Sequence, residues 1–66
     1  MRRTESLWGS AITRAAYDDE TKILEVTFTS GQTYTFHEVP AEIYDGLLAA
    51  GSPGRYYHAF IKGQFA

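Results

Sequence analysis

Two stretches in the middle of the chain alternate apolar and polar residues, and together they predict a β-hairpin. The first stretch is Ile23–Ser30 and the second is Thr33–His37. Strict alternation places every second side chain on the same face of a strand. The intervening Ser30-Gly31-Gln32 suits a tight reversal, because glycine tolerates a positive φ. The apolar face of this hairpin carries Leu24, Val26, Phe28, Tyr34 and Phe36.

A third strand is predicted before the hairpin, at Ser10–Tyr17. It contains the β-branched residues Ile12 and Thr13, which favour extended backbone. The polar segment Asp18–Lys22 follows and predicts the turn that leads into the hairpin.

After Val39-Pro40 the apolar residues recur every three or four positions, which predicts helices. The first helix is expected over Ala41–Ala50, because proline suits a helix start and Gly51 suits its end. Ser52-Pro53 then predicts the start of a second helix, which extends to about Gly63.

The order β-β-β-α-α predicts an α+β fold, in which two helices pack on the apolar face of a three-stranded antiparallel meander. Residues 10–66 are expected to form this single domain, and residues 1–9 are expected to form a flexible N-terminal arm. Trp8 in that arm either adds a stacking ring to a binding surface or pins the arm to the core. The predicted core consists of Leu24, Val26, Phe28, Tyr34, Phe36, Ile43, Leu47, Phe60 and Ile61.

Composition excludes several classes of protein. The 66 residues include no cysteine, which excludes disulfides, zinc–thiolate sites and thiol catalysis. A chain of this length buries only about 60% of its unfolded surface, so a cofactor cleft between two lobes is not expected, and neither is any cofactor. No apolar run approaches the roughly 20 residues of a membrane span, and no signal peptide is evident. A cytoplasmic protein without a membrane partner is therefore expected.

Charge is distributed unevenly along the chain. The formal net charge is −2, but residues 1–16 and residues 49–66 each carry +2 while residues 17–48 carry −6. The acidic total argues against a general polyanion binder. If the two ends meet in the fold, their basic residues would form one local patch; otherwise they are ordinary solvated charges.

Several segments, taken together and with their spacing, resemble the KTSC domain family. They are Ile12, Tyr17-Asp18, Leu24–Phe36, Val39-Pro40, Tyr44, Ser52–His58 and Ile61-Lys62. The resemblance implies a small domain that occurs at the C-terminus of some lysyl-tRNA synthetases and as a stand-alone protein in bacteria and phages. The association with synthetases suggests RNA as a partner. This chain differs from the family pattern at Phe36, which replaces the second tyrosine of a Y-x-Y motif, and at His58, where asparagine is common.

A binding surface is predicted at the start of the second helix. Free N–H groups and the helix dipole favour an anion there, and an arginine supplies a bidentate donor. The candidate nucleic-acid- or anion-binding residues are Ser52, Gly54, Arg55, Tyr56, Tyr57, His58 and Lys62, with Arg2, Arg3 and Arg14 as auxiliary basic residues. The alternative is an ordinary capped helix with solvated charges.

The hairpin aromatics Tyr34 and Phe36 also have two interpretations. Paired aromatic side chains on a sheet form a base-stacking platform in some RNA-binding modules. Core packing is favoured here, because the two predicted helices are available to cover this face.

No pattern indicates an enzyme or a metal site. His37 and His58 lack the spacing of a metal pair, and Asp18–Glu20 lacks a calcium-ligand pattern. Two hypotheses remain. The first is a small non-enzymatic binding module for RNA or another nucleic acid. The second is a protein-interaction or homo-oligomerising adaptor of a bacterial or phage system, which would use the polar sheet face or a free edge strand.

Overall fold

An antiparallel sheet followed by helices makes up the described part of the chain. The computed structural model describes residues 2–7 and 11–65. The strands are β1 (Arg2–Ser6), β2 (Ile12–Asp18), β3 (Ile23–Phe28) and β4 (Thr33–Phe36). The helices are α1 (Ala41–Ala49), α2 (Pro53–Tyr56) and the π-helix η1 (Tyr57–Ile61), which follows α2 without a break. The predicted α+β class is confirmed. No helix of the described residues has the length and apolar character needed to cross a membrane.

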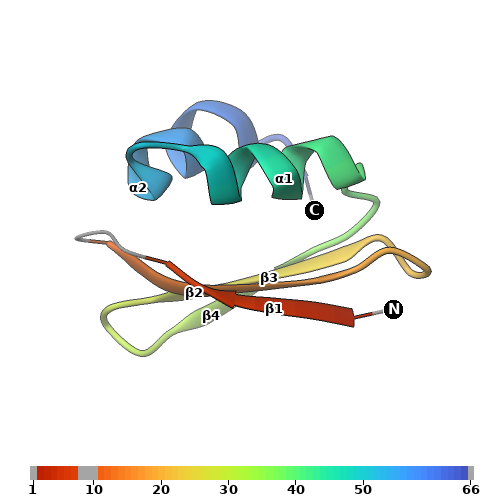
Figure 1. The fold of residues 1–66 in the computed structure, drawn as a ribbon, viewed down its shortest axis with the longest axis horizontal. Helices are drawn as coiled ribbons and strands as arrows, with labels where there is room; N and C mark the ends of the chain where they lie inside the picture. Colours follow the sequence, from red (N-terminus) through yellow and green to blue (C-terminus); the bar gives the residue numbers. More distant parts are fainter. Residues whose placement is uncertain (1, 8–10, 66) are drawn as a thin grey trace.

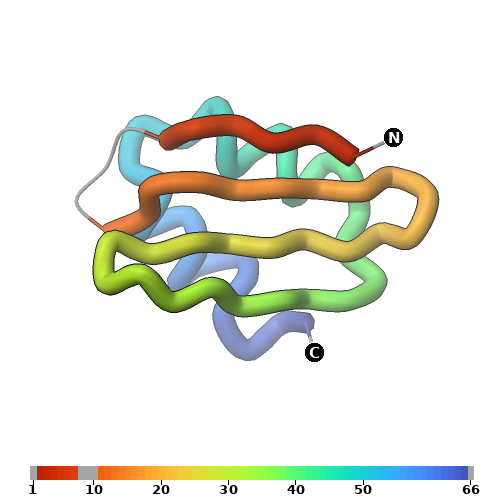
Figure 2. Tube along the Cα trace, turned by 90° about the horizontal axis from the view of Figure 1, so that it is seen from below, coloured from red at the N-terminus to blue at the C-terminus, as the bar shows by residue number. Residues whose placement is uncertain are grey.

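The four strands lie side by side in chain order, each antiparallel to its neighbour (Figure 2). The predicted hairpin is confirmed as β3–β4, in which Leu24 lies opposite Phe36 and Val26 opposite Tyr34. Gly31 in the turn has φ of +94°, a conformation that L side chains rarely adopt.

The sheet has one strand more than the three predicted, because Arg2–Ser6 forms β1 beside β2 and not a free arm. All five residues of β1 are polar and exposed, so no alternation of apolar residues marks the strand in the sequence. Ion pairs from Arg2 to Glu25 and from Arg3 to Asp45 (3.1 Å) add to its backbone pairing with β2. Trp8 lies outside the described residues.

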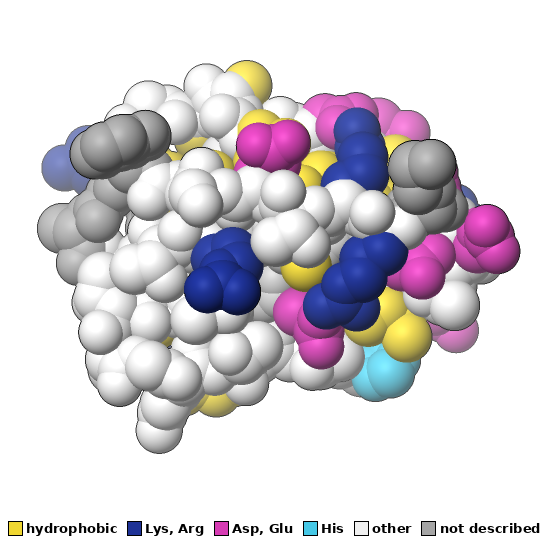
Figure 3. All heavy atoms as spheres, turned by 60° about the horizontal axis from the view of Figure 1, so that its bottom comes forward, with side chains coloured by type: hydrophobic (Ala, Val, Ile, Leu, Met, Phe, Trp, Pro, Cys, Tyr) yellow, Lys and Arg dark blue, Asp and Glu magenta, His cyan; other side chains and the backbone are white. Residues whose placement is uncertain are grey.

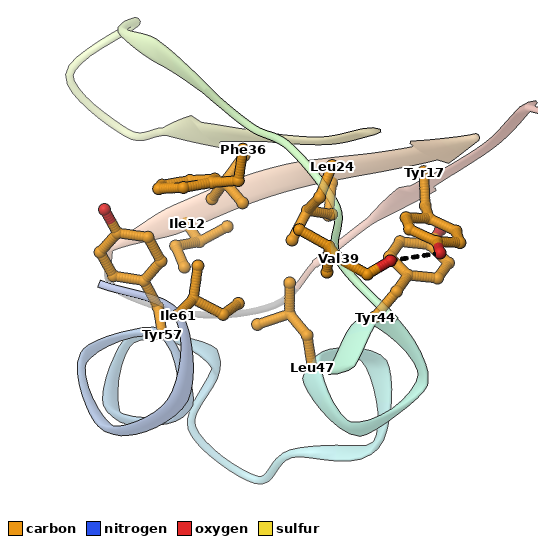
Figure 4. Close-up of a cluster of buried hydrophobic side chains, with 11 residues drawn as sticks. Ile12, Tyr17, Leu24, Phe36, Val39, Tyr44, Leu47, Tyr57 and Ile61 are labelled. Carbon is orange, nitrogen blue, oxygen red and sulfur yellow. Dashed lines mark hydrogen bonds between the residues drawn. The ribbon is translucent and has the colours of Figure 1, made fainter. Parts of the chain in front are cut away.

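The helices cover one face of the sheet and leave the other face open (Figure 1). Side chains from both layers meet in a single apolar core (Figure 4). Its members are Ile12, Ala15, Tyr17, Leu24, Val26, Phe36, Val39, Tyr44, Leu47, Tyr57 and Ile61.

The core prediction is right for five of its nine residues and wrong for two. Leu24, Val26, Phe36, Leu47 and Ile61 are buried, and Phe28 and Ile43 are half-buried against the core. Tyr34 is 47% exposed and Phe60 is 53% exposed.

Both errors come from the placement of the helical layer. Tyr57 and Ile61 turn toward the sheet. Phe60 is on a different face of the helix, where its ring lies against Tyr56 at 4.7 Å between centroids. Tyr34 stays open because the helices do not cover its side chain.

A buried tyrosine joins the two layers. The Tyr17 hydroxyl donates a 2.6 Å hydrogen bond to the Val39 carbonyl in the β4–α1 connection (Figure 4). The Tyr17 ring stacks on Tyr44 of α1 at 5.2 Å between centroids. The Tyr44 hydroxyl is buried without a hydrogen-bond partner, and the Arg3 guanidinium lies 4.8 Å from the centre of its ring.

The two tyrosines provide a matched pair of hydroxyl deletions. Tyr17→Phe leaves the buried Val39 carbonyl without its donor and is expected to lower the free energy of unfolding by about 1–3 kcal/mol. Tyr44→Phe removes a hydroxyl that has no partner and is expected to leave stability unchanged or to raise it. Urea denaturation of both variants measures the difference. Equal losses in the two variants would contradict this account of the core.

Stability is also expected to fall at alkaline pH. Burial raises the pKa of the Tyr17, Tyr44, Tyr56 and Tyr57 phenols. In the unfolded chain these phenols ionise near pH 10, so above that pH the folded chain binds more protons than the unfolded chain. The free energy of unfolding should be insensitive to these groups below about pH 9 and should fall as the pH rises beyond about 10. Urea titrations at pH 7, 9 and 11 check this, and a constant value up to pH 11 would contradict it.

Candidate functional site

A hollow of about 390 Å³ lies between the β3–β4 turn and the helix η1. Its walls come from the end of β3, the turn, the start of β4 and one side of η1. The lining residues are Ala11, Phe28, Thr29, Ser30, Gln32, Tyr34, Tyr57, His58 and Lys62. We refer to this feature as the aromatic hollow.

Three rings form its apolar part. Phe28, at the end of β3, lies edge-on to Tyr34 (5.4 Å between centroids) and to Tyr57 (5.0 Å). Tyr57 is buried, whereas Tyr34 keeps about half of its surface free. The hollow therefore offers an accessible aromatic ring with two further rings to hold it in position.

One cation, Lys62, lines the hollow together with His58. Among the described residues, no carboxylate lines it. The Lys62 N–H donates to the Tyr57 carbonyl at 2.8 Å, five residues back along the chain. This π-type bond widens the last turn and brings residue 62 close to one turn beyond residue 57, on nearly the same side of the helix. Lys62 and Tyr57 therefore line the same hollow.

The turn side of the hollow is fixed by hydrogen bonds. The Phe28 N–H donates to the Gln32 carbonyl at 2.8 Å, and the Gly31 N–H donates to the Phe28 carbonyl at 2.9 Å. The Tyr34 hydroxyl donates to Oε1 of the Gln32 side chain at 2.7 Å. The Gln32 amide and the Tyr34 ring are therefore held together on the same wall.

The structure divides the predicted binding residues into two groups. Tyr57, His58 and Lys62 line the aromatic hollow, whereas Ser52, Gly54, Arg55 and Tyr56 do not. Tyr56 packs on α1, and its hydroxyl and ring lie directly against Gly46.

The start of α2 lacks the features expected of an anion site. The Ser52 side chain makes no capping hydrogen bond, and Gly54 lies against Ala11. Pro53 at the first helical position has no N–H, and the Tyr56 N–H already donates to the Ser52 carbonyl at 3.0 Å, so few N–H groups are free there.

The auxiliary arginines lie away from the hollow. Arg2 and Arg14 are on the open face of the sheet, where they line a second, polar hollow of about 280 Å³ together with Glu25. Figure 3 shows this face, on which basic and acidic side chains lie among other polar atoms. Arg3 faces the helices and pairs with Asp45. The predicted basic patch from the two chain ends is thus not assembled at one site.

Sequence reasoning missed the part of the site that the turn contributes. Phe28 and Tyr34 were expected in the core, and Gln32 was expected only in the turn. The one feature of the sequence that pointed to this part of the site was the aromatic pair Tyr34 and Phe36, for which core packing was favoured over base stacking. Among the described residues, no three histidine, aspartate or glutamate side chains come together in a way that could hold a metal ion.

Comparison with known proteins places this arrangement in a family. The family model described as the KTSC domain matches residues 9–65. The chain belongs to the KTSC family. A protein from Tsukamurella paurometabola is 48% identical over 56 residues, which cover 85% of this chain and 84% of that protein. A KTSC domain protein from Yersinia pestis has a crystal structure that superposes with a TM-score of 0.93 at 29% identity, covering 100% of this chain and 93% of that one.

Other relatives carry the KTSC domain as a small part of a larger chain. A lysine–tRNA ligase from a Nostoc species is 42% identical over 57 residues. The match covers 86% of this chain but only 10% of the ligase. The KTSC domain is thus found both in small proteins and within such ligases, and these comparisons indicate no catalytic family.

The contact between Tyr56 and α1 can be tested with a glycine pair. A Cβ at Gly46 would lie 2.7 Å from Cζ of Tyr56, so Gly46→Ala has to displace the ring. Overpacking of this kind costs about 1–3 kcal/mol and outweighs the roughly 1 kcal/mol by which alanine favours a helix. Gly51→Ala is the control, because nothing lies within 4 Å of the point that its Cβ would occupy. Thermal unfolding measures both variants, and a Gly46→Ala variant more stable than the parent would refute this packing.

Proposed function

We propose that this KTSC domain is a non-enzymatic module that binds single-stranded RNA by stacking an unpaired base in the aromatic hollow. The observation that carries the proposal is the composition of that hollow, which an accessible Tyr34 ring lines together with Lys62 and His58, while no carboxylate of residues 2–7 and 11–65 lines it. A planar apolar surface next to a cation matches a nucleotide, which joins a flat base to a phosphate.

The dimensions and energetics agree with one base as the occupant. Ligand pockets commonly have volumes of about 300–1,000 Å³, and this hollow lies in the lower part of that range. Stacking of a base on an aromatic side chain contributes about 1–3 kcal/mol and tolerates any base. The edge-on contacts of Phe28 with Tyr34 and Tyr57 fix the rings before a ligand arrives.

The charge of the domain limits the kind of binding. With a net charge of −2 the domain lacks the broad positive surface that drives non-specific binding. We expect a local contact of modest affinity, in which one or two phosphates meet Lys62 and His58. The relatives named as lysine–tRNA ligases favour RNA as the polymer.

A titration of the ¹⁵N-labelled domain with a mixed-sequence RNA hexamer tests the proposal. Amide shifts should cluster at residues 28–34 and 57–62. Tyr34→Ala should weaken binding about 5- to 100-fold through the loss of stacking. Lys62→Ala should weaken binding and make its salt dependence shallower by about one phosphate contact.

Arg55→Ala is the matched control, because it also removes one exposed cation but lies outside the hollow. We expect its affinity to stay within about twofold of the parent, since it contacts no bound phosphate. Equal losses in the Arg55 and Lys62 variants would favour the helix start over the hollow. No shifts at low or at physiological salt would reject RNA binding.

The competing function is a protein-interaction or self-associating module. Its specific support is Phe60, an apolar ring that is 53% exposed on the helical layer. A sedimentation coefficient that rises with protein concentration, together with the absence of RNA shifts, would favour this second function.

A further inference from the structure

The hydrogen bond between Tyr34 and Gln32 fixes the orientation of an amide at the edge of the aromatic hollow. Residues 32 and 34 are two positions apart, so their side chains lie on the same side of the chain. The Tyr34 hydroxyl donates to Gln32 Oε1, and the Gln32 backbone is itself fixed by the bond from the Phe28 N–H. The Tyr34 hydroxyl thus favours the rotation of the amide in which the oxygen faces Tyr34.

This bond determines what Gln32 can offer a ligand. A glutamine amide has one acceptor oxygen and a nitrogen with two donor hydrogens. The Tyr34 hydroxyl uses one of the two lone pairs of the oxygen, whereas no residue in the ranges 2–7 and 11–65 accepts a hydrogen bond from the Gln32 nitrogen. The side chain therefore presents donors to the hollow that it lines.

We infer that Gln32 selects bases with an oxygen acceptor at position 4 of a pyrimidine or position 6 of a purine (uracil or guanine) over bases with an amino group at that position (cytosine or adenine). This inference rests on the proposed binding of an unpaired base. A base stacked on Tyr34 presents its hydrogen-bonding edge to the neighbouring amide. The O4 atom of uracil accepts from the Gln32 N–H, whereas the N4 amino group of cytosine at the same place is a donor and forms no hydrogen bond with that N–H.

In this arrangement Tyr34 has two separable roles. Its ring stacks on the base, and its hydroxyl positions Gln32. The hydroxyl is a positioning group, because it acts on the base only through the amide. Removal of the hydroxyl alone should therefore abolish base selection and preserve stacking.

Uracil and cytosine provide the sharpest comparison, because their rings have the same size and differ at position 4. Fluorescence anisotropy with labelled hexauridylate and hexacytidylate at pH 7 measures the two affinities. We expect the uridine oligomer to bind about 3- to 10-fold more tightly, which is the affinity difference expected from one hydrogen bond. Tyr34→Phe should reduce this ratio to about one while the affinity for the cytidine oligomer changes little.

Gln32→Glu reverses the polarity of the same group. A carboxylate accepts but does not donate, so the variant should favour the cytidine oligomer, although repulsion of the phosphates weakens its binding overall. Tyr56→Phe is the control, because it deletes a hydroxyl outside the hollow. Its uridine-to-cytidine ratio should equal that of the parent.

The outcomes separate this inference from the function on which it rests. If neither oligomer binds, both are rejected. If both bind equally and Tyr34→Ala still abolishes binding, the stacking function stands and base selection by Gln32 is overturned. A preference for uridine that survives in both Tyr34→Phe and Gln32→Glu would also overturn it.

Discussion

The hydrogen bond from the Tyr17 hydroxyl to the Val39 carbonyl is the contact on which the arrangement of the two layers depends. Val39 is fixed on both sides, because its N–H also donates to the Lys22 carbonyl at 2.9 Å. The chain leaves the sheet at this point, so the two bonds set where α1 begins. Tyr44 and Leu47 then reach the core from α1, and the short connection to α2 determines where η1 lies over the sheet. The aromatic hollow is thus positioned from the opposite end of the domain.

The elements that could be predicted are those in which buried apolar residues recur at a regular spacing along the sequence. The β3–β4 hairpin alternates strictly, and α1 has an apolar stripe, so both were recovered to within two residues. Strand β1 has no buried residue and owes its place to backbone pairing and two ion pairs, neither of which leaves a pattern in Arg2–Ser6. The π-helix likewise leaves no pattern in the sequence, because its wider turn depends on how the helix packs against the sheet.

The residues of the candidate site were harder to predict than the fold, since the exposure of a side chain depends on how far one layer extends over the other. Tyr34 and Phe36 occupy equivalent positions in the alternation, yet Phe36 is buried and Tyr34 is half exposed. The sequence predicted Tyr57, His58 and Lys62 among seven binding residues; these three line the aromatic hollow and the other four do not. The sequence could not show that the other residues of the hollow would come from the β3–β4 turn and not from the start of α2. The turn and η1 are about 30 residues apart in the chain, and only the fold brings them together.

The hollow follows from the small size of the domain. With α1 of nine residues and a second helical segment of nine, the helical layer does not cover Tyr34 on the inner face of the sheet. An exposed aromatic ring does not contribute the stabilising free energy of its burial, and a small domain buries little apolar surface in total. The π-turn offsets part of this cost, because it buries Tyr57 and Ile61 and also carries Lys62 to the open end. A regular α-helix would rotate residue 62 away from residue 57. The irregular turn therefore brings a cation into the same hollow as the uncovered ring, and this combination distinguishes the hollow from an incomplete core.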